Sequence, residues 1–550
     1  MKKKVLSVVL ASAMALSLAA CGSDTTETAS STASSTTTAS VQESSTDASS
    51  DAATEFVLSE VKVVVDGTLT ATEDNRQDAF VEQWDAAVSE KLGHDIHINI
   101  TQLDHSSYKD AVGRLIIGGD LPDVMIMSAD MFKQYQTTGL LWDMSEAYDN
   151  AEFQSRLTLS AVNENLKTDD GALYGFAPYY GNGCVTYVKQ AWLDAVGING
   201  DDIKTFDDYY NMLLAFKNGD PDGNGVDGDT YGTIAAGYAN IGEAPYTNYL
   251  PEFWQDGYPA VLQDENGVWY DGFTADACKA ALQRIRQGYV DGVIDPDTLT
   301  ASTKIAREKW FSNEQSGSSG AFTYWAGTWY QTLTDNLIKN EVDSELYVLS
   351  PIEEIKNTTG GFLNREAPVW VIIDDGDGDN SREQAIFDAF IETMLDGDTV
   401  QMLWTYGAED VHWSVKAEEF VTNAGTDNEK TYSYADGEFH LKQSPNDENS
   451  LWKKNLIDNA LVISPLTNGY SSATDLAVEG NKFFTDNCVD APQGASCETL
   501  TNYSADINDA KTNVISAVVI EGMDVDEAMN TYYTGVVGAV IEQALAELNQ

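Results

Sequence analysis

The chain has 550 residues, which is enough for two to four domains with sizeable apolar cores. Its 31 Lys and Arg residues stand against 88 Asp and Glu residues, giving a formal net charge of -57. A field of that sign repels phosphate backbones and anionic lipid surfaces, so nucleic-acid binding is excluded as a function. The five histidines show no metal-ligand or catalytic spacing, which argues against a zinc enzyme.

The N-terminus carries the features of an export signal. The basic run Lys2–Lys4 precedes an apolar stretch, Val5–Leu18, that is too short to anchor the chain in a membrane. The residues Leu-Ala-Ala-Cys at 18–21 resemble a bacterial lipobox, so we expect 1–20 to be a signal peptide and Cys21 to carry diacylglyceryl and palmitate. The alternative is an ordinary signal peptide cleaved beside a cysteine. Because no later apolar run approaches about 20 residues, we expect membrane contact through the lipid alone.

A low-complexity segment follows the signal. Residues 21–56 are mostly Ser, Thr, Ala and Asp, with almost no large apolar side chain before the end of the segment. Such a composition cannot bury enough surface to offset the entropy of ordering, so we expect a disordered linker. A tether of this kind suits a protein that docks on a membrane partner.

Four further cysteines fall in the body of the chain. Cys488 and Cys497 lie nine positions apart around Pro and Gly residues, and an exported protein can join them in a disulfide or keep them as thiols. Cys278 lies in a segment of helical pattern, 275–287, and is predicted to be a small core residue.

The predicted elements of the body begin as an alternation of strands and helices. Valines at 61, 63 and 65 indicate a strand, and apolar residues four apart indicate a helix over 80–92 that ends at Gly93. A strand at 96–100, a helix at 108–117 and a strand at 123–127 follow. This order predicts an α/β domain with a parallel sheet and right-handed crossovers.

Helical signals dominate later in the chain. Thr205 and Asp208 have the spacing of a capping-type helix start, and Ser381 with Gln384 has the spacing of a second capping box. The stretch 514–548 is largely helical by its apolar pattern. We find no internal repeat.

The loop 220–229 has the pattern of a calcium-binding loop. Oxygen-bearing side chains stand at positions 1, 3 and 5 with Gly225 at position 6, as at the start of an EF-hand loop. Position 12 is Tyr231 instead of Glu, so either Asp227 or Asp229 must complete the shell, and we favour Asp229. The expected ligands of a structural Ca²⁺ are Asp220, Asp222, Asn224, Val226 through its carbonyl, and Asp229.

A solvated Asp/Gly turn is the alternative to a calcium loop. The string 375–379 shows that this acidic chain also builds such turns elsewhere, and we assign that string no metal because it lacks the Asn-Gly turn.

Several segments, taken in their order and spacing, carry a family resemblance. They are Leu121-Pro-Asp-Val124, Trp192-Leu-Asp-Ala-Val-Gly197, Asp220-Pro-Asp-Gly-Asn-Gly225, Gly288-Tyr-Val-Asp-Gly-Val-Ile-Asp295, Trp404–Trp413 and 518–533. On these segments the chain resembles a large, family 1 sugar-binding lipoprotein of a Gram-positive ABC importer. Related proteins of that type carry a similar calcium loop in the second lobe.

The resemblance implies a two-lobed, periplasmic-binding-protein-like α/β fold of type II, with hinge crossovers between the lobes. By analogy, 57–183 and 322–370 form lobe 1, and 184–321 and 371–550 form lobe 2. It also implies a lipid-anchored monomer on the outer face of the cell membrane, which delivers solute to ABC permease subunits. Closure of the lobes around the solute is the expected motion.

Aromatic side chains near the expected crossovers are candidate sugar contacts. A ring covers the apolar face of a sugar while neighbouring amides or carboxylates bind its hydroxyls. The alternative for each residue is an ordinary core or rim aromatic. The candidates are Tyr179, Tyr180, Trp254, Tyr258, Tyr324, Trp325 and Trp329.

We therefore expect a non-catalytic receptor for an oligosaccharide, and the overall charge favours a neutral or weakly charged sugar. The alternatives are a secreted glycoside hydrolase, which needs a matched pair of carboxylates, and a receptor for a peptide or another solute. Glu409 and His412 are three residues apart, but no third partner is evident, and the resemblance implies that they are structural or line the cleft. The sequence names neither the sugar nor its length.

Overall fold

The computed structural model describes most of the body of the chain. The described residues are 56–66, 76–104, 107–157, 161–168, 170–178, 181–236, 261–264, 266–312, 317–364, 367–444, 451, 468–471, 474–490, 495 and 497–549. The expected signal peptide, the expected lipid site Cys21 and all of the expected linker except Phe56 lie outside these residues.

The first sheet confirms the predicted alternation of strands and helices. Its four strands are ordered β11-β3-β1-β2, and β1 runs parallel to both β2 and β3. The last strand comes from far along the chain and is antiparallel, with Trp370 opposite Ile126. The strands are β1 (Glu60–Asp66), β2 (His97–Leu103), β3 (Val124–Met127) and β11 (Val369–Ile372).

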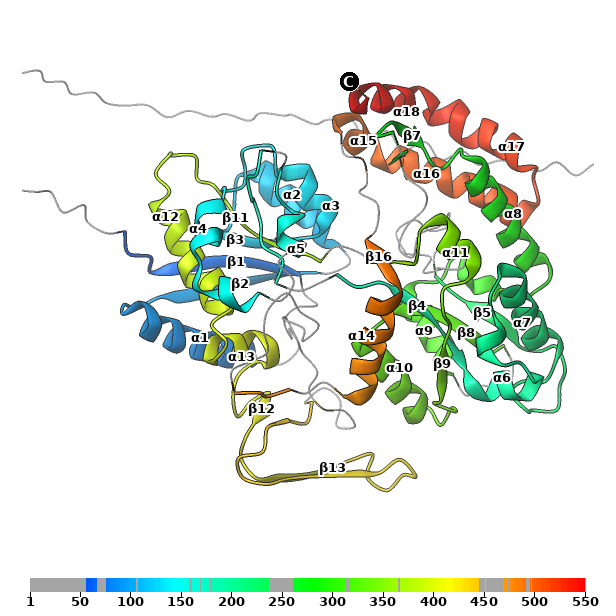
Figure 1. Ribbon diagram of the computed structural model, residues 1–550, viewed down its shortest axis with the longest axis horizontal. Helices are drawn as coiled ribbons and strands as arrows, with labels where there is room; N and C mark the ends of the chain where they lie inside the picture. Colours follow the sequence, from blue (N-terminus) through cyan, green and yellow to red (C-terminus); the bar gives the residue numbers. More distant parts are fainter. Residues whose placement is uncertain are drawn as a thin grey trace, which may run out of the picture. The chain divides into compact units, whose positions relative to one another are not determined.

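Helices cover both faces of this sheet. Helices α1 and α13 lie on one side and α2 and α3 on the other (Figure 1), as right-handed crossovers require. The ring of Trp404 packs against Phe80 and Phe390, with centroids 5.0 and 5.3 Å away. The helices are α1 (Arg76–Leu92), α2 (Tyr108–Gly118), α3 (Ala129–Tyr135), α4 (Ser145–Asn150), α5 (Ala161–Glu164), α12 (Ser381–Ile386) and α13 (Thr399–Tyr406).

The second sheet has its own apolar core. Its order is β5-β8-β4-β9, with β5 parallel to β8 and β4 antiparallel to both of its neighbours. All six residues of β4 are buried, as are the first six of β8, so both faces of these central strands are covered. The strands are β4 (Cys184–Lys189), β5 (Tyr231–Ile234), β8 (Ser319–Trp325) and β9 (Leu346–Val348).

Helices and a short parallel pair of strands complete this second core. Gly183 and Phe484 touch closely enough that a side chain at Gly183 would clash with the Phe484 ring. The elements are α6 (Gln190–Val196), α7 (Phe206–Asn218), α9 (Thr303–Phe311), α10 (Thr328–Lys339), α11 (Glu353–Thr358), α14 (Asp475–Asn487), β10 (Phe362–Asn364) and β16 (Cys488–Asp490).

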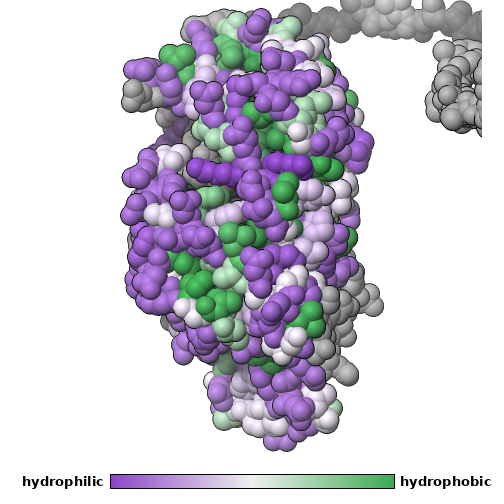
Figure 2. Space-filling view, turned by 90° about the vertical axis from the view of Figure 1, so that its right-hand side faces the viewer, coloured by the Kyte–Doolittle hydropathy of each residue, from purple (hydrophilic) through white to green (hydrophobic). Residues whose placement is uncertain are grey.

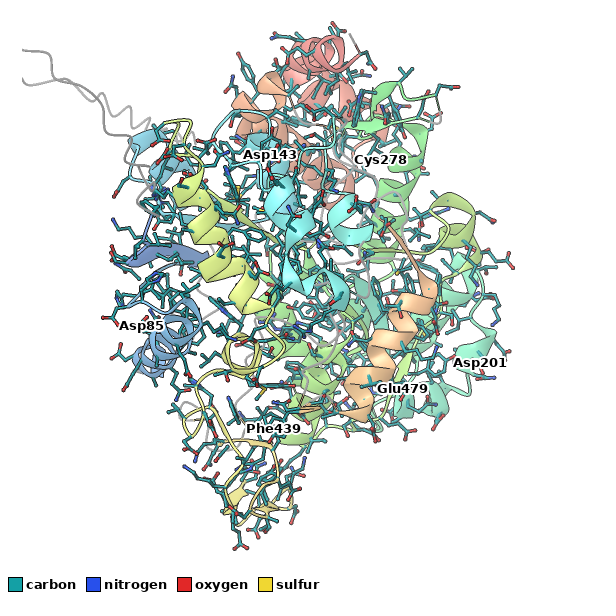
Figure 3. All side chains as sticks on the ribbon, turned by 60° about the vertical axis from the view of Figure 1, so that its left-hand side comes forward. Asp85, Asp143, Asp201, Cys278, Phe439 and Glu479 are labelled. Carbon is teal, nitrogen blue, oxygen red and sulfur yellow. The ribbon has the colours of Figure 1, made fainter. Side chains whose placement is uncertain are left out.

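A third cluster is helical and confirms the helical pattern predicted for the C-terminal stretch. Cys278 of α8 is buried among these helices, as predicted (Figure 3). The elements are α8 (Asp276–Val290), α15 (Glu498–Asn502), α16 (Ser504–Ile515), α17 (Val525–Ala528) and α18 (Gly535–Leu548), with the hairpin β6 (Val261–Gln263) and β7 (Trp269–Asp271). Wider turns of helix at 516–521 and 529–534 join α16, α17 and α18.

Two short antiparallel pairs follow α13. One joins β12 (Trp413–Ser414) to β15 (His440–Leu441), and the other joins β13 (Glu418–Thr422) to β14 (Lys430–Tyr434). The β13–β14 hairpin reaches α10, because the Asn428 side chain donates to the Ile338 carbonyl over 2.9 Å.

The core clusters place the division between lobes differently from the expected boundaries. Residues 322–362 belong to the second core because β8 pairs with β4 and β5, while 371–408 belong to the first because β11 pairs with β3. The chain passes to the second core after Ala177, returns before Ala367, and leaves the first core again after Ala408.

One predicted helix start is confirmed and the other is wrong. The Thr205 side chain accepts from the Asp208 amide, and the Asp208 carboxylate accepts from the Thr205 amide. Ser381 is instead the first residue of α12, because Asp379 accepts hydrogen bonds from the amide and hydroxyl of Ser381.

The surface of the body is polar, as the acidic composition predicts. One face of the chain is mostly hydrophilic, with only scattered hydrophobic residues (Figure 2). In the described part of the chain, no helix is both long enough and apolar enough to cross a membrane. Cys488 is the first residue of β16 and Cys497 directly precedes α15, and both are partly buried.

Candidate sugar-binding and calcium sites

Three of the seven candidate sugar contacts lie together at the end of β8. Tyr324 and Trp325 are its last two residues, and Trp329 lies in the first turn of α10. A tight turn at Gly327, with φ of 67°, brings the helix back against the strand. Tyr179, Tyr180, Trp254 and Tyr258 lie outside the described residues.

The three aromatics differ in how much surface they offer. Tyr324 is 3% exposed and stacks on Phe322 at 5.2 Å, so it is mainly a core residue of a strand covered on both faces. Trp325 and Trp329 are half-buried and pack against the edge of the second core. The Tyr187 hydroxyl fixes the strand end by donating to the Trp325 carbonyl over 2.9 Å.

The position of these tryptophans in the sheet favours a ligand site. Because β5 and β8 are parallel, their carboxyl ends lie at one edge of the sheet. In open α/β sheets ligands bind outside the carboxyl ends of the strands. Trp325 and Trp329 therefore stand where a sugar would meet this sheet.

The predicted calcium loop joins α7 to β5 and is closed by backbone and side-chain hydrogen bonds. Gly228 donates to the Gly219 carbonyl over 3.1 Å, which closes the ring of the loop. Gly225 donates to Asp220 Oδ2 over 2.9 Å, and its φ of 85° suits glycine alone. The Asn224 amide donates to Asp222 Oδ2 over 3.2 Å and to Asp229 Oδ2 over 3.0 Å.

The loop brings together three carboxylates, and the hydrogen-bond donors around them do not satisfy all of their oxygens. Oδ1 of Asp220 and Oδ1 of Asp229 are both buried and accept no hydrogen bond. Burial raises the pKa of Asp222 above its ordinary value, and the neighbouring Asp220 and Asp229 carboxylates raise it further. Buried carboxylate oxygens that have no hydrogen-bond partner within the described residues suit a hard cation such as Ca²⁺.

The structure also bears on which residues complete the set. Asp229 is half-buried and bonded to Asn224, whereas Asp227 is exposed, which favours Asp229 as the fourth side chain. Tyr231, at position 12, is the first residue of β5 and is held by the sheet. The Val226 side chain is 52% exposed, as expected for a residue that contributes through its backbone.

Two lysines beside the loop were not predicted. Lys217 Nζ donates to the carbonyls of Gly228 and Thr230 over 2.6 and 3.1 Å, so it ties α7 to the loop exit. Lys189 is 2% exposed and lies between the rings of Trp192 and Trp310. Burial lowers the pKa of Lys189 to about 8, an effect that the Asp222 carboxylate opposes. Neither lysine stands in a recognisable motif, so the sequence carries no signal for them.

A second acidic group of the described chain has a different character. Oxygen atoms of Asp374, Asp375 and Glu383 lie within 4.8 Å of one another. Glu383 is buried, but Oε1 accepts from Arg382 Nη1 and from the Asp375 amide, both at 3.3 Å. Arg382 supplies the countercharge here, and we assign this group no metal.

His412 is held by backbone groups. It is 4% exposed, and its Nδ1 accepts from the Ala408 amide over 2.8 Å. The backbone of the nearby Glu409 is tied to Gln83, because its amide donates to Gln83 Oε1 over 2.8 Å and its carbonyl accepts from Gln83 Nε2 over 3.1 Å. These contacts support the structural interpretation of this segment.

The candidate calcium loop and the candidate sugar contacts lie at opposite ends of β8. Gly317, two residues before β8, donates to the Asp229 carbonyl over 2.8 Å, while Trp325 ends the strand. Seven residues at a rise of about 3.3 Å separate the two ends by about 20 Å. A cation in the loop would therefore not touch a sugar on Trp325.

Comparison with known proteins defines the class. The chain belongs to the bacterial extracellular solute-binding protein family, whose model matches residues 71–359, just over half of the chain. Members of this class are extracellular proteins that bind a solute, which confirms the family resemblance seen in the sequence.

Two curated relatives from Bacillus subtilis (strain 168) are similar over part of their length. Lipoprotein LipO is 29% identical over 208 residues, which are 36% of this chain and 39% of LipO. The polygalacturonan/rhamnogalacturonan-binding protein YtcQ is 23% identical over 230 residues, 40% of this chain and 43% of YtcQ. The match thus spans about two fifths of the length of either relative.

Solved structures with low identity share the fold over almost the whole chain. A solute-binding protein for HMO from Bifidobacterium longum infantis has a TM-score of 0.58 at 15% identity, covering 90% of this chain and 98% of that one. The alginate-binding protein AlgQ2 has a TM-score of 0.56 at 16% identity, covering 89% and 97%. The fold is that of two-domain α/β solute-binding proteins.

Proposed function

We propose that this chain is a lipid-anchored receptor that captures an oligosaccharide outside the cell and delivers it to the permease of an ABC importer. The observation that carries the proposal is the pair of half-buried tryptophans, Trp325 and Trp329, at the carboxyl end of β8. Half-buried indole rings can stack on the apolar face of a sugar ring. The chain captures solute without catalysing a reaction.

The names of similar proteins support a sugar as the solute. YtcQ is a polygalacturonan/rhamnogalacturonan-binding protein, and AlgQ2 binds alginate. The Streptococcus pneumoniae protein FusA, with a TM-score of 0.53 at 16% identity over 89% of this chain and 98% of that one, was solved with fructo-nystose. The ligands named for these proteins include both acidic and neutral sugars, so similarity alone leaves the charge of the ligand open.

Attachment and partners follow from the N-terminal signal. LipO is a lipoprotein, which supports Cys21 as the lipid site. The linker between Cys21 and the body would let a monomer rotate and dock on permease subunits at the outer face of the membrane. We expect Cys21→Ala to leave the chain unlipidated or to release it from the membrane fraction. Wild-type lipid labelling of that variant would disprove the assignment.

A structural Ca²⁺ is part of the proposal. The residues that would hold it are Asp220, Asp222, Asn224, Val226 and Asp229. Two similar structures are described as AlgQ2 without calcium ion and as a FusA EF-hand mutant, which supports a calcium loop in proteins of this fold. When bound, the ion supplies positive charge that offsets the repulsion of the clustered carboxylates.

The alternatives are a secreted glycoside hydrolase and a receptor for a peptide or another solute. A hydrolase would convert its sugar, whereas a receptor returns it unchanged. Membership of a solute-binding family favours the receptor.

A thermal-shift screen of sugars and peptides, followed by analysis of the recovered ligand, tests the proposal. We expect one class of oligosaccharide to raise the melting temperature, and we expect chromatography to recover that sugar intact. Stabilisation by peptides alone, or conversion of the sugar into products, would refute the receptor for an oligosaccharide.

A further inference from the structure

A ladder of aromatic rings leads from the second core to the end of β8. Trp310 of α9 stacks on Phe322 with centroids 5.2 Å apart, and Phe322 stacks on Tyr324 at the same distance. Tyr324 meets the ring of Trp329 edge to face at 4.8 Å. Exposure is 0% for Trp310 and 3% for Tyr324, whereas Trp329 is half-buried, so the ladder ends where side chains reach solvent.

The side chain of an arginine contacts the last two rings of this ladder. The guanidinium of Arg307, also on α9, lies 5.3 Å from the ring centroid of Tyr324 and 5.3 Å from that of Trp329. Its Nη1 donates to the Tyr324 hydroxyl. Arginine has five N–H donors in a planar fork, and this contact uses one of them.

The other cations of α9 are placed differently. Lys309 pairs with Asp295 at 2.6 Å and with Asp297 at 2.8 Å. Lys304 pairs with Glu308 on the exposed face at 3.8 Å. Arg307 is half-buried and, within the described part of the chain, makes no ion pair, although this chain has 88 acidic residues. Aromatic rings, in place of the carboxylate that ordinarily pairs with an arginine, contact its guanidinium.

We infer that Arg307 binds a carboxylate of the ligand, and that the captured sugar is a uronic-acid-containing oligosaccharide. The planar fork of arginine matches a carboxylate in a bidentate fashion, and two rings already restrict its orientation. Trp329 at the same spot would cover the sugar ring that bears the carboxylate. This inference rests on the proposed receptor function.

The inference revises the expectation of a neutral or weakly charged sugar. The net charge of -57 is spread over the whole chain, and acids farther than a Debye length of about 8 Å are largely screened at physiological salt. A guanidinium in direct contact with the ligand therefore determines which ligand charge the site prefers more than the mean field of the protein does. The mean charge is a poor guide to one site.

Titration calorimetry on the full-length chain in calcium tests the inference with matched sugars. The probes are oligosaccharides of galacturonate, glucuronate and mannuronate, each with its methyl ester, which removes the charge and keeps the ring. We expect the wild-type chain to bind at least one acidic form more tightly than its ester, with an affinity that falls as salt increases.

Variants separate charge recognition from packing. Arg307→Gln should weaken binding of the acidic form about 10- to 100-fold and leave the ester nearly unaffected, while Arg307→Lys should recover part of the loss. Lys304→Gln removes the same charge one turn earlier on α9, away from the rings, and should change neither affinity. Melting temperatures of all three variants check that each is folded.

Three results would overturn the inference. An equal loss for acid and ester in Arg307→Gln would mean that Arg307 only packs. Binding of neutral oligosaccharides in preference to every uronate would refute the acidic ligand and leave the oligosaccharide receptor standing. Binding of no oligosaccharide of either kind would refute the receptor proposal and the inference together.

Discussion

At the scale of single residues, the acidic loop 220–229 holds like charges close together in a partly buried place. The Asp222 carboxyl is partly desolvated beside two other carboxylates, and its pKa is raised above the ordinary value. A raised pKa means that the folded chain binds this proton more tightly than the unfolded chain does. In the absence of a cation, the contribution of Asp222 to stability is therefore greatest in acid and is lost as pH rises through the folded pKa.

The variant Asp222→Asn should separate repulsion from calcium binding. In chelator at neutral pH we expect a melting temperature about 1 °C above wild type, because a change of about 1 kcal/mol gives such a shift in a body of roughly 490 residues. In calcium the order should reverse, because the variant lacks a ligand. The gain in chelator should shrink as pH falls, which a melting series in buffers from neutral to acid measures.

Asp227→Asn provides the control for this prediction. It removes the same charge from an exposed position of the same loop and should alter neither the chelator nor the calcium curve appreciably. If neither chelator nor calcium changes the melting temperature of the wild type, the calcium assignment is contradicted.

Residue-level prediction from sequence is possible where a motif fixes the geometry. The loop 220–229 could be found because glycines and oxygen side chains recur at set positions. Arg307 could not, because a single arginine in an amphipathic helix has no pattern, and its role depends on rings supplied by β8 and α10. Tyr324 was a candidate contact, but its strand is covered on both faces, so it is mainly core.

At the scale of elements, the junction of β8 and α10 depends on Gly327. Its φ of 67° is a conformation that residues with a side chain avoid, and a Cβ there would collide with Asn481 of α14. We expect Gly327→Ala to cost about 1–3 kcal/mol of the free energy of unfolding and to weaken sugar binding through displacement of Trp329. Chemical denaturation and calorimetry measure the two effects.

Gly139→Ala is the matched control for the junction. Gly139 has a similar φ of 78°, but an added Cβ would meet nothing within 4 Å. If both variants lose equal stability and both keep full affinity, the collision with α14 has no role in placing the tryptophan.

The β13–β14 hairpin is a second element whose stability can be argued from its contacts. Two-stranded hairpins are marginal in water, and this one stacks Phe420 on Tyr432 at 5.2 Å and Tyr434 on His440 at 4.0 Å. Tyr432→Ala should lower the free energy of local opening by about 1 kcal/mol, which corresponds to an amide exchange rate about fivefold higher. Hydrogen exchange over 418–434 should rise while the global melting temperature changes little.

Thr431→Ala, on the exposed face of β14, should leave this exchange unchanged. Equal exchange in the wild type and Tyr432→Ala would show that the ring stack does not stabilise the hairpin.

Local elements were predictable where long-range pairing was not. The alternation β1-α1-β2-α2-β3 follows from apolar periods of 2 and 3.6, and all five elements are confirmed. Nothing in those periods shows that β11 joins β3 from more than two hundred residues away, or that β8 belongs to the second core. The expected lobe boundaries missed these pairings because register between distant strands is set by tertiary packing.

At the scale of the whole chain, the calcium loop and the candidate sugar contacts are separated by the length of β8. We therefore expect the two sites to have distinct roles. A structural ion in the loop 220–229, about 20 Å from the tryptophans, would stabilise the second core without touching the sugar. Chelation should therefore lower the melting temperature by several degrees and change sugar affinity by less than about threefold at a temperature where the chain stays folded. Complete loss of affinity in a folded, calcium-free chain would contradict this separation.

The central claim is that Trp325 and Trp329 bind the sugar, and titration of the best oligosaccharide into Trp325→Ala and Trp329→Ala tests it most directly. Trp269→Ala, which changes a half-buried tryptophan on the separate hairpin β6–β7, is the control for the loss of an indole. We predict about a tenfold or greater loss of affinity in each of the two site variants, with only a small fall in melting temperature, and unchanged affinity in the control. Wild-type affinity in both site variants would contradict the account.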